Sequence, residues 1–148
     1  MSDGRQVSLR QRWIFCGKNM RIAINGMLLG GRSSGVEVTI SELVRALAVL
    51  PGEHEYRVYL PSYTDRAALQ NVPGLTLCPV RLPWRSRVLR ILWEHLFLPR
   101  RARRDGCDLL HCPGYIAPWQ CSLPVVLTIH DCFAFTHPEF CRLPNRLY

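Results

Sequence analysis

Residues 20–48 read MRIAINGMLLGGRSSGVEVTISELVRALA, and this stretch decides the fold. A short apolar run, Arg21–Asn25, closes at Gly26 and is followed by a loop rich in glycine and serine. Ser34 and Glu37 then fit the capping box, in which the serine accepts from the third helical N–H and the glutamate reaches back to the serine's own N–H. Apolar residues recur at helical spacing after this cap, at Val36, Ile40, Leu43, Val44, Leu47 and Leu50. The pattern predicts a strand, a glycine-rich loop and a helix.

The rest of the chain repeats this alternation. Short apolar runs predict further strands at 56–60, 75–80, 108–112 and 125–129. A wide apolar face at helical spacing covers 86–104, and Pro99 is expected to kink or split that helix. Strands that alternate with helices indicate an α/β fold with a parallel sheet wound by crossover connections.

The length and composition of the chain limit the classes of protein to which it can belong. The chain has 148 residues, 48% of them apolar and only 20% charged, which predicts one packed domain. The formal charge of +8 favours an anionic partner, and a phosphate group, a nucleic acid and an acidic lipid surface all remain open. Seven cysteines, odd in number and without C-x-x-C spacing or a secretory signal, indicate free thiols in a reducing cytosol. Because no stretch approaches the roughly 20 apolar residues of a membrane span, we expect a soluble or peripheral protein.

The two ends of the chain differ from its middle. Residues 1–19 are polar, basic and aperiodic, so they are interpreted as a leader outside the domain, either disordered or produced by a mis-assigned start. The domain is expected to cover 20–148, with Met20 as the native start. Its last residues, RLPNRLY, resemble the first turn of a helix, which predicts that the domain is truncated at its C-terminal end.

Several predicted strands end in residues suited to hydrogen-bond chemistry. His130 and Asp131 follow the run 125–129, and His111 lies next to the end of the run 108–112. Ligands of open parallel sheets bind beyond the carboxyl ends of the strands, so these residues and the glycine-rich loop are expected at one edge of the sheet. Adjacent side chains of an extended chain point to opposite sides, so Asp131 is expected to cap the following turn rather than to hold His130.

Each of these features could instead have a purely structural role. Gly26, Gly30, Gly31 and Gly35 lead into a helix whose free N–H groups favour a phosphate, but a strand-to-helix loop also needs glycines simply to turn. The spacing is not G-x-G-x-x-G and no G-K-[ST] follows, which disfavours dinucleotide dehydrogenases and P-loop NTPases. A backbone carbonyl could equally satisfy His130.

Metal binding is not predicted. A zinc site would have to gather His111, Cys112, His130 and Cys132, and these lack the usual spacing between paired ligands. No paired carboxylates of the kind that hold a divalent ion beside a diphosphate are visible either. A structural role is the favoured interpretation of both His111 and His137.

An arginine cluster brackets the predicted helix that carries Trp84 and Trp93. Its members are Arg81, Arg85, Arg87, Arg90, Arg100, Arg101, Arg103 and Arg104. Arginines around an apolar helix with tryptophans are typical of an interfacial helix at a membrane, although most charge runs are solvated faces. No recognised nucleic-acid-binding module accompanies the charge, so nucleic acid is not an expected partner.

Three stretches together resemble a known family. Residues 20–48, then LLHCPGY at 109–115, then PVVLTIHDCFAFTHPEF at 124–140, are similar in order and spacing to the N-terminal domain of family-4-type (group 1) retaining glycosyltransferases. The resemblance covers 20–148 and implies a Rossmann-like parallel sheet with helices on both faces, the N-terminal half of a GT-B fold. It also implies a two-domain enzyme in which a nucleotide-diphosphate sugar binds mainly to the second domain and the acceptor mainly to the first.

The resemblance assigns roles to particular residues. The family's active-site histidine, at the end of a central strand, corresponds to His130, which would hydrogen-bond the transferred sugar or the reacting groups. The family's glycine loop corresponds to Gly31 and to Ser34-Gly35-Val36-Glu37, where Ser34 replaces the first of two frequent glycines, and its backbone would approach the donor diphosphate or the acceptor. The further residues that would line the cleft are His111, Tyr115 and Asp131.

The resulting hypothesis is a hexosyltransferase-like domain acting in polysaccharide biosynthesis. It would transfer a sugar from a nucleotide-diphosphate sugar to a glycan or lipid-linked acceptor, with no other cofactor. It would be inactive alone, because the donor-binding C-terminal domain is missing in cis. We expect a cytoplasmic location, with peripheral contact at the inner face of the membrane through the arginine-rich helix. The alternative is a non-catalytic basic α/β module that binds an anionic polymer or a membrane surface.

Overall fold

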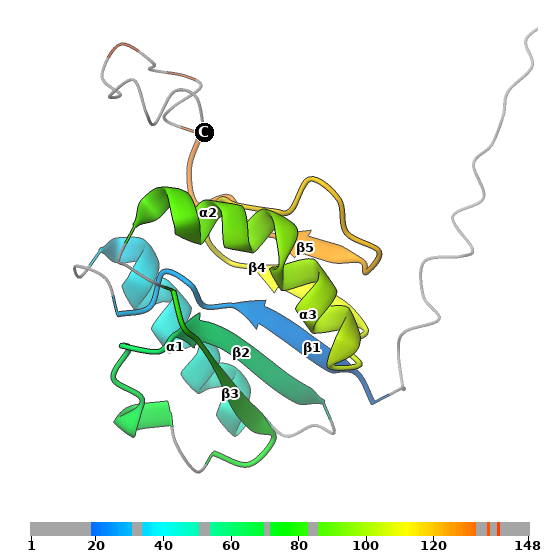
Figure 1. Ribbon diagram of the computed structural model, residues 1–148. Coiled ribbons are helices and arrows are strands. Elements are labelled where there is room, and N and C mark those ends of the chain that lie inside the picture. Colours follow the sequence, from blue (N-terminus) through cyan, green and yellow to red (C-terminus); the bar gives the residue numbers. More distant parts are fainter. Residues whose placement is uncertain are drawn as a thin grey trace, which may run out of the picture.

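The computed structural model describes residues 19–30, 34–50, 54–69, 72–82 and 86–132, together with Thr136 and Glu139. It contains a five-stranded, wholly parallel sheet in the order β3-β2-β1-β4-β5 (Figure 1). The strands are β1 (Arg21–Asn25), β2 (Glu55–Pro61), β3 (Leu75–Val80), β4 (Leu109–Cys112) and β5 (Val125–Leu127). The predicted parallel α/β sheet is confirmed.

The helices lie where the sequence predicts them. The first, α1 (Gly35–Val49), connects β1 to β2, and a short 3-10 turn, η2 (Ala67–Leu69), lies between β2 and β3. The second apolar segment forms α2 (Arg87–Leu96) and α3 (Leu98–Arg104), which meet at Phe97. Pro99 lies in the first turn of α3, where its missing N–H breaks no helical hydrogen bond, and the expected split is confirmed.

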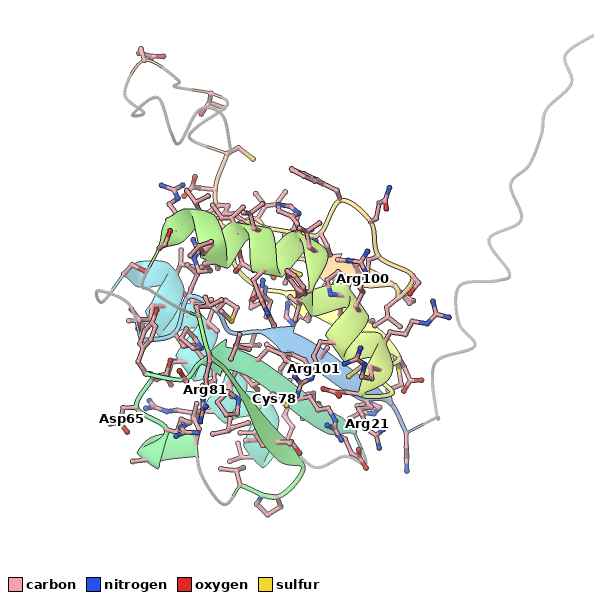
Figure 2. The ribbon with its side chains drawn as sticks, viewed as in Figure 1. Arg21, Asp65, Cys78, Arg81, Arg100 and Arg101 are labelled. Carbon is pink, nitrogen blue, oxygen red and sulfur yellow. The ribbon has the colours of Figure 1, made fainter. Side chains whose placement is uncertain are left out.

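The helices cover opposite faces of the sheet. Ile40 and Val44 of α1 pack into a core that also contains Ile24 of β1 and Val58 and Leu60 of β2. The other face buries Leu98 and Ala102 of α3 against strand residues of opposite parity, Ala23, Tyr59 and Leu110. Figure 2 shows Arg101 on α3 above this second face and Cys78 on β3. The domain therefore has the three layers of a Rossmann-like fold.

Strand order locates the ligand-binding edge. The chain moves from β1 to β2 and β3 on one side, then crosses back to β4 and β5 on the other side of β1. The direction of winding reverses between β1 and β4, and open α/β sheets bind ligands at such a switch point, beyond the carboxyl ends of the strands. In this sheet those ends are Asn25 and Cys112.

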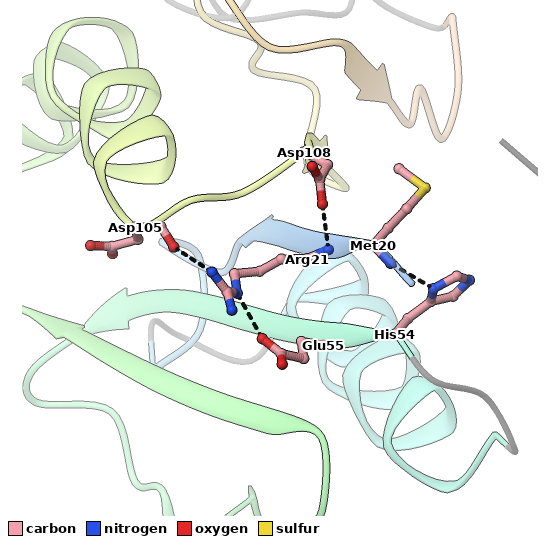
Figure 3. A network of polar contacts seen from close by, with 6 residues as sticks. All are labelled: Met20, Arg21, His54, Glu55, Asp105 and Asp108. Carbon is pink, nitrogen blue, oxygen red and sulfur yellow. Dashed lines mark hydrogen bonds and ion pairs between the residues drawn. The ribbon is translucent and has the colours of Figure 1, made fainter. Parts of the chain in front are cut away.

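The opposite edge of the sheet is held together by its own polar groups (Figure 3). Arg21 Nε donates to Glu55 Oε2 at 2.7 Å, which joins the starts of β1 and β2. The Arg21 backbone N–H donates to Asp108 Oδ2 at 2.8 Å, which joins β1 to β4, and the Met20 N–H donates to His54 Nδ1 at 3.2 Å. Charged groups at this edge thus serve strand alignment.

One predicted strand differs from the structure. The run 125–129 looks like a buried strand in sequence, but β5 ends at Leu127 and all three of its residues are exposed. The reason is its position, because among the described residues β5 pairs only with β4 and forms the edge of the sheet. The strand that carries His130 is therefore an edge strand in the described part of the sheet, not a central one.

Other expectations concern thiols and termini. Five described cysteines are free, as predicted: Cys78, Cys107, Cys112, Cys121 and Cys132. None of the helices that the structure describes is both long and apolar enough to cross a bilayer. The leader at 1–18, the end of the chain at 140–148, Gly31, Trp84 and His137 lie outside the described residues.

Candidate functional site

The loop between β1 and α1 begins with a bond to β2 and one tight turn. The Gly26 N–H donates to the Tyr59 carbonyl at 2.8 Å, and the Leu29 N–H returns to the Gly26 carbonyl at 2.9 Å. Gly30 follows with a φ of +81°, and a Cβ at this position would lie 2.7 Å from Thr64 Oγ1. Folding alone thus explains a glycine at position 30.

The start of α1 is capped by serine but not by a complete capping box. Ser34 Oγ accepts from the Glu37 N–H at 3.2 Å, as predicted. The Glu37 carboxylate does not return to the serine: its Oε1 accepts from the Gly30 N–H at 2.6 Å, and its Oε2 is buried without a partner among the described residues. The loop folds back on its own helix, which brings the Gly30 N–H within reach of the glutamate.

Gly35 differs from Gly30. A Cβ at position 35 would meet nothing within 4 Å, and the backbone there has no positive φ. The hydrogen bonds of the described residues use the N–H groups of Glu37 and Val38 but leave those of Gly35 and Val36 without a partner. Among the described residues the first turn of α1 therefore has two backbone donors without a partner, and folding does not require a glycine at position 35.

The loop after β4 packs directly against this first turn. A Cβ on Gly114 would lie 2.6 Å from Leu28 Cδ1 and 3.6 Å from Val36 Cγ1. The missing side chain lets the backbone after β4 approach both the glycine-rich loop and α1. Sequence reasoning from strand ends expected the two segments at one edge of the sheet, and the structure brings them into contact there.

His130 is held by the same loop. Its Nε2 lies 2.7 Å from the Pro113 carbonyl oxygen, which can only accept, so Nε2 carries the proton. In the neutral ring, Nδ1 is then the nitrogen left to accept a hydrogen bond. The Tyr115 ring meets the imidazole edge-on, with centroids 5.2 Å apart. A backbone carbonyl and an aromatic ring thus fix the orientation of His130.

Tyr115 and Asp131 form a pair beside His130. The Tyr115 hydroxyl donates to Asp131 Oδ2 at 2.9 Å. Burial, followed by this hydrogen bond, raises the pKa of Tyr115. Its φ of 54° is the only positive value at a described non-glycine residue, a strained conformation that often occurs at functional sites. The turn that Asp131 is expected to cap lies at 133–135, outside the described residues.

His111 lies deeper, between β4 and the chain after β5. Its Nε2 is 3.2 Å from Thr128 Oγ1, and burial lowers its pKa. The neutral ring joins the ends of two neighbouring strands. Thr128 follows His111 by 17 residues and lies two residues before His130, so this contact lets His111 support the segment that carries His130.

A buried polar network under the switch point is not among the sequence predictions. Asn25 Nδ2 donates to Glu94 Oε1 at 3.3 Å, and Arg90 Nη1 donates to the same oxygen at 3.2 Å. Asn25 Oδ1 in turn accepts from the Met27 N–H at 3.2 Å. Burial raises the pKa of Glu94, against the opposing effects of Arg90 and Asn25. The i,i+4 spacing of Arg90 and Glu94 is the signal that could have revealed this pair.

The described side chains form no metal centre. No group of three or more histidine, cysteine, aspartate or glutamate residues among them is placed to hold an ion. The histidines of the zinc alternative have other partners, since His111 contacts Thr128 and His130 contacts Pro113.

Comparison with known proteins identifies the family. The family described as Glycosyltransferase Family 4 matches residues 33–148, which is more than half of the chain. The match includes the capped start of α1, the loop after β4, and His130. No curated protein matches the chain. The match and the Rossmann-like sheet agree, and the chain belongs to Glycosyltransferase Family 4.

Proposed function

We propose that this chain is the acceptor-side domain of a retaining enzyme of polysaccharide biosynthesis. The reaction would move a sugar from a nucleotide-diphosphate sugar to a glycan or lipid-linked acceptor. Membership of a glycosyltransferase family supports sugar transfer. The observation that carries the assignment to these residues is the contact of Gly114 with Leu28 and Val36, next to the Pro113 carbonyl that anchors His130.

His130 is proposed as the catalytic residue. Its Nε2 is engaged by Pro113, so Nδ1 accepts from a hydroxyl of the transferred sugar in the neutral ring. Glycosyl transfer passes through a cationic sugar with a departing diphosphate, so a polar group that is already oriented lowers the barrier more than one that must reorganise. Tyr115 and Asp131 act beside it as positioning residues.

The first turn of α1 is proposed to bind an oxygen of either substrate. The free N–H groups of Gly35 and Val36 suit a diphosphate oxygen or an acceptor hydroxyl. The Glu37 carboxylate adds a negative charge to this same turn, where it interacts favourably with the positive end of the helix dipole. That charge favours the uncharged acceptor hydroxyl over the diphosphate.

The 148 residues alone are proposed to be inactive. Under this proposal the site described above would form one wall of a cleft, and a second domain would supply the cationic groups that stabilise a departing diphosphate. Incubation of the chain with a panel of nucleotide sugars and acceptors is expected to give no product. Turnover above background would contradict this part of the proposal.

The decisive substitution is His130→Ala in the enzyme that contains this domain. Loss of a preorganised polar group is expected to lower kcat by about a hundredfold or more. The circular dichroism spectrum should stay unchanged, because only one hydrogen bond to Pro113 is lost. His54→Ala at the opposite edge is the matched control and should keep normal turnover. An unchanged rate in His130→Ala removes this residue from the mechanism.

The alternative class is a basic module that binds an anionic polymer or a membrane without catalysis. The exposed arginines of α3 favour it. Under that alternative, charge reversal at Arg100, Arg101, Arg103 and Arg104 abolishes binding, whereas His130→Ala changes nothing. His130→Ala therefore separates the two functions, whereas the arginine substitutions test the binding alone.

A further inference from the structure

Trp119 is an exposed tryptophan on the loop between β4 and β5. It is 80% exposed, more than any other phenylalanine, tyrosine or tryptophan that the structure describes. Sequence reasoning expected Trp93 at an interface, but Trp93 packs against the core, with its ring centroid 6.4 Å from that of Tyr59. Because a large aromatic ring stabilises a fold mainly when it is buried, core packing does not account for Trp119.

The Trp119 indole is held in one orientation by His95. The two rings stack with centroids 4.2 Å apart and an interplanar angle of 22°, and the Trp119 backbone N–H donates to His95 Nδ1 at 3.3 Å. Burial lowers the pKa of His95, so the imidazole is neutral at pH 7 and Nδ1 can accept this bond. One face of the indole is therefore covered by a fixed ring, and the opposite face is open to solvent. A side chain that is already ordered loses little entropy when a ligand binds to it.

This indole lies on the side of the domain that carries the candidate site. His95, which holds it, directly follows Glu94, whose carboxylate accepts from Asn25 at the end of β1 at 3.3 Å. Figure 1 shows the loop between β4 and β5 beside α2, where Trp119 meets His95. The same loop supplies the backbone carbonyl that holds His130. One loop therefore connects the indole to the proposed catalytic residue.

A second exposed aromatic residue precedes Trp119 on this loop. Tyr115 is 42% exposed, and its ring meets the His130 imidazole edge-on. Ile116, which lies between the two in sequence, is 8% exposed and anchors the loop in the core. The loop thus presents one aromatic ring beside His130 and a second ring four residues further along. Sugar rings carry C–H groups on their faces and hydroxyls around their edges, so the C–H face packs on an aromatic ring while the hydroxyls stay hydrated.

We propose that the open indole face of Trp119 binds a sugar ring of the acceptor, beyond the sugar that contacts His130. The acceptor is then a glycan with at least two sugar units. This inference rests on the proposed function, because it names the class of acceptor that the same domain binds. Trp119 contacts a sugar that takes no part in the bond change, so it contributes to acceptor binding and not to the chemical step.

Binding of neutral trisaccharides to the 148-residue chain tests the proposal. Nuclear magnetic resonance titrations with cellotriose, maltotriose and mannotriose should shift the Trp119 indole N–H resonance with at least one of them. Trp119→Ala should bind that trisaccharide at least about tenfold more weakly, and Trp119→Phe, with a smaller ring, should lie between the two. Tyr63→Ala removes another exposed aromatic residue and should bind as the wild type does.

Kinetics of the enzyme that contains this domain give an independent readout. Trp119→Ala should raise the KM for an oligosaccharide acceptor about tenfold and leave kcat unchanged, whereas His130→Ala lowers kcat. An unchanged KM in Trp119→Ala with a lowered kcat in His130→Ala would contradict the Trp119 site alone. Trisaccharide binding at Trp119 without turnover of any nucleotide sugar by that enzyme would instead contradict the proposed sugar transfer. The two failures are therefore distinguishable.

Three results of the titrations would overturn the proposal. The first is equal trisaccharide binding by the wild type and by Trp119→Ala, with circular dichroism spectra that show both proteins folded. The second is the absence of an indole shift with all three trisaccharides. The third is an indole shift that depends on the concentration of the chain and not on sugar, which would make a second copy of the chain the occupant.

Discussion

Individual residues of the glycine-rich loop serve different purposes. Gly30 has a φ of +81° and no room for a Cβ beside Thr64, whereas Gly35 has open space and no positive φ. We expect Gly30→Ala to lower the free energy of unfolding by more than about 1 kcal/mol and Gly35→Ala to leave it unchanged or to raise it. Urea denaturation measures both. Equal losses of stability in the two variants would contradict the conclusion that folding requires a glycine at position 30 but not at position 35.

Buried histidines make stability depend on pH. Burial lowers the pKa of His111, so the folded state binds this proton less readily than the unfolded chain. The His111 contribution is therefore constant above about pH 6.5 and becomes destabilising as the pH falls below that value. His95 acts in the same direction, and Glu94, whose pKa burial raises, acts in the opposite direction.

The His111 contribution can be isolated by comparison. His111→Gln keeps an amide for Thr128 but cannot titrate. We expect the stability of the wild type, relative to this variant, to decline between pH 7.5 and about pH 5.5, measured as urea midpoints. His95 and Glu94 are common to both proteins and cancel in the difference. A constant difference across this range would show that the ring is not held neutral by burial.

At the scale of elements, the start of α1 depends on its serine cap. Ser34 Oγ satisfies the Glu37 N–H at 3.2 Å. Ser34→Ala should therefore lower the free energy of unfolding by about 1 kcal/mol, and Ser34→Asp, which can still cap, should restore most of it. Thermal and urea denaturation measure the change. If alanine and aspartate have the same effect, the cap does not stabilise the helix.

Element boundaries could be predicted from sequence because their causes are local. Ser34 caps α1 through a residue three positions away, and Pro99 divides the second helical segment by its own missing N–H. The side of α2 that faces the protein could not be predicted. Periodicity defines an apolar face but not the layer against which it packs, and Glu94 is turned inward by Asn25, which is 69 residues away.

The candidate site could likewise be predicted from sequence only in part. Topology rules brought His130 and the start of α1 to one edge of the sheet, since both follow strands. The partners that orient His130 are the Pro113 carbonyl and the Tyr115 ring, and neither has a sequence signature. The exposure of β5 also could not be predicted, because a continuous apolar run reads alike in a central strand and in an edge strand.

For the whole molecule, the two edges of the sheet are protected unequally. Pro79 interrupts the hydrogen-bonding edge of β3, whereas β5 has no such residue and its side chains are 38% to 45% exposed. We expect the chain to self-associate through β5, and Val126→Lys to reduce the association that light scattering detects at increasing concentration. Thr76→Lys on β3 is the control. Equal effects of the two lysines would exclude β5 as the contact.

The two edges of the sheet also have different roles in the domain. The edge with Arg21, Glu55 and Asp108 aligns the strands, and the opposite edge carries His130 and the capped turn. The groups that align the strands and the candidate ligand site therefore lie at opposite edges of the sheet.

The central claim is that His130 and the first turn of α1 form one ligand site. Nuclear magnetic resonance titration of the chain with acceptor sugars and nucleotide sugars tests it most directly. At least one of these ligands should shift the His130 ring and the Gly35 amide resonances together, with a single Kd, while the Arg21 and Glu55 amides at the far edge stay unchanged. Independent shifts of the two groups, or no shift with any ligand of the panel, would contradict the claim.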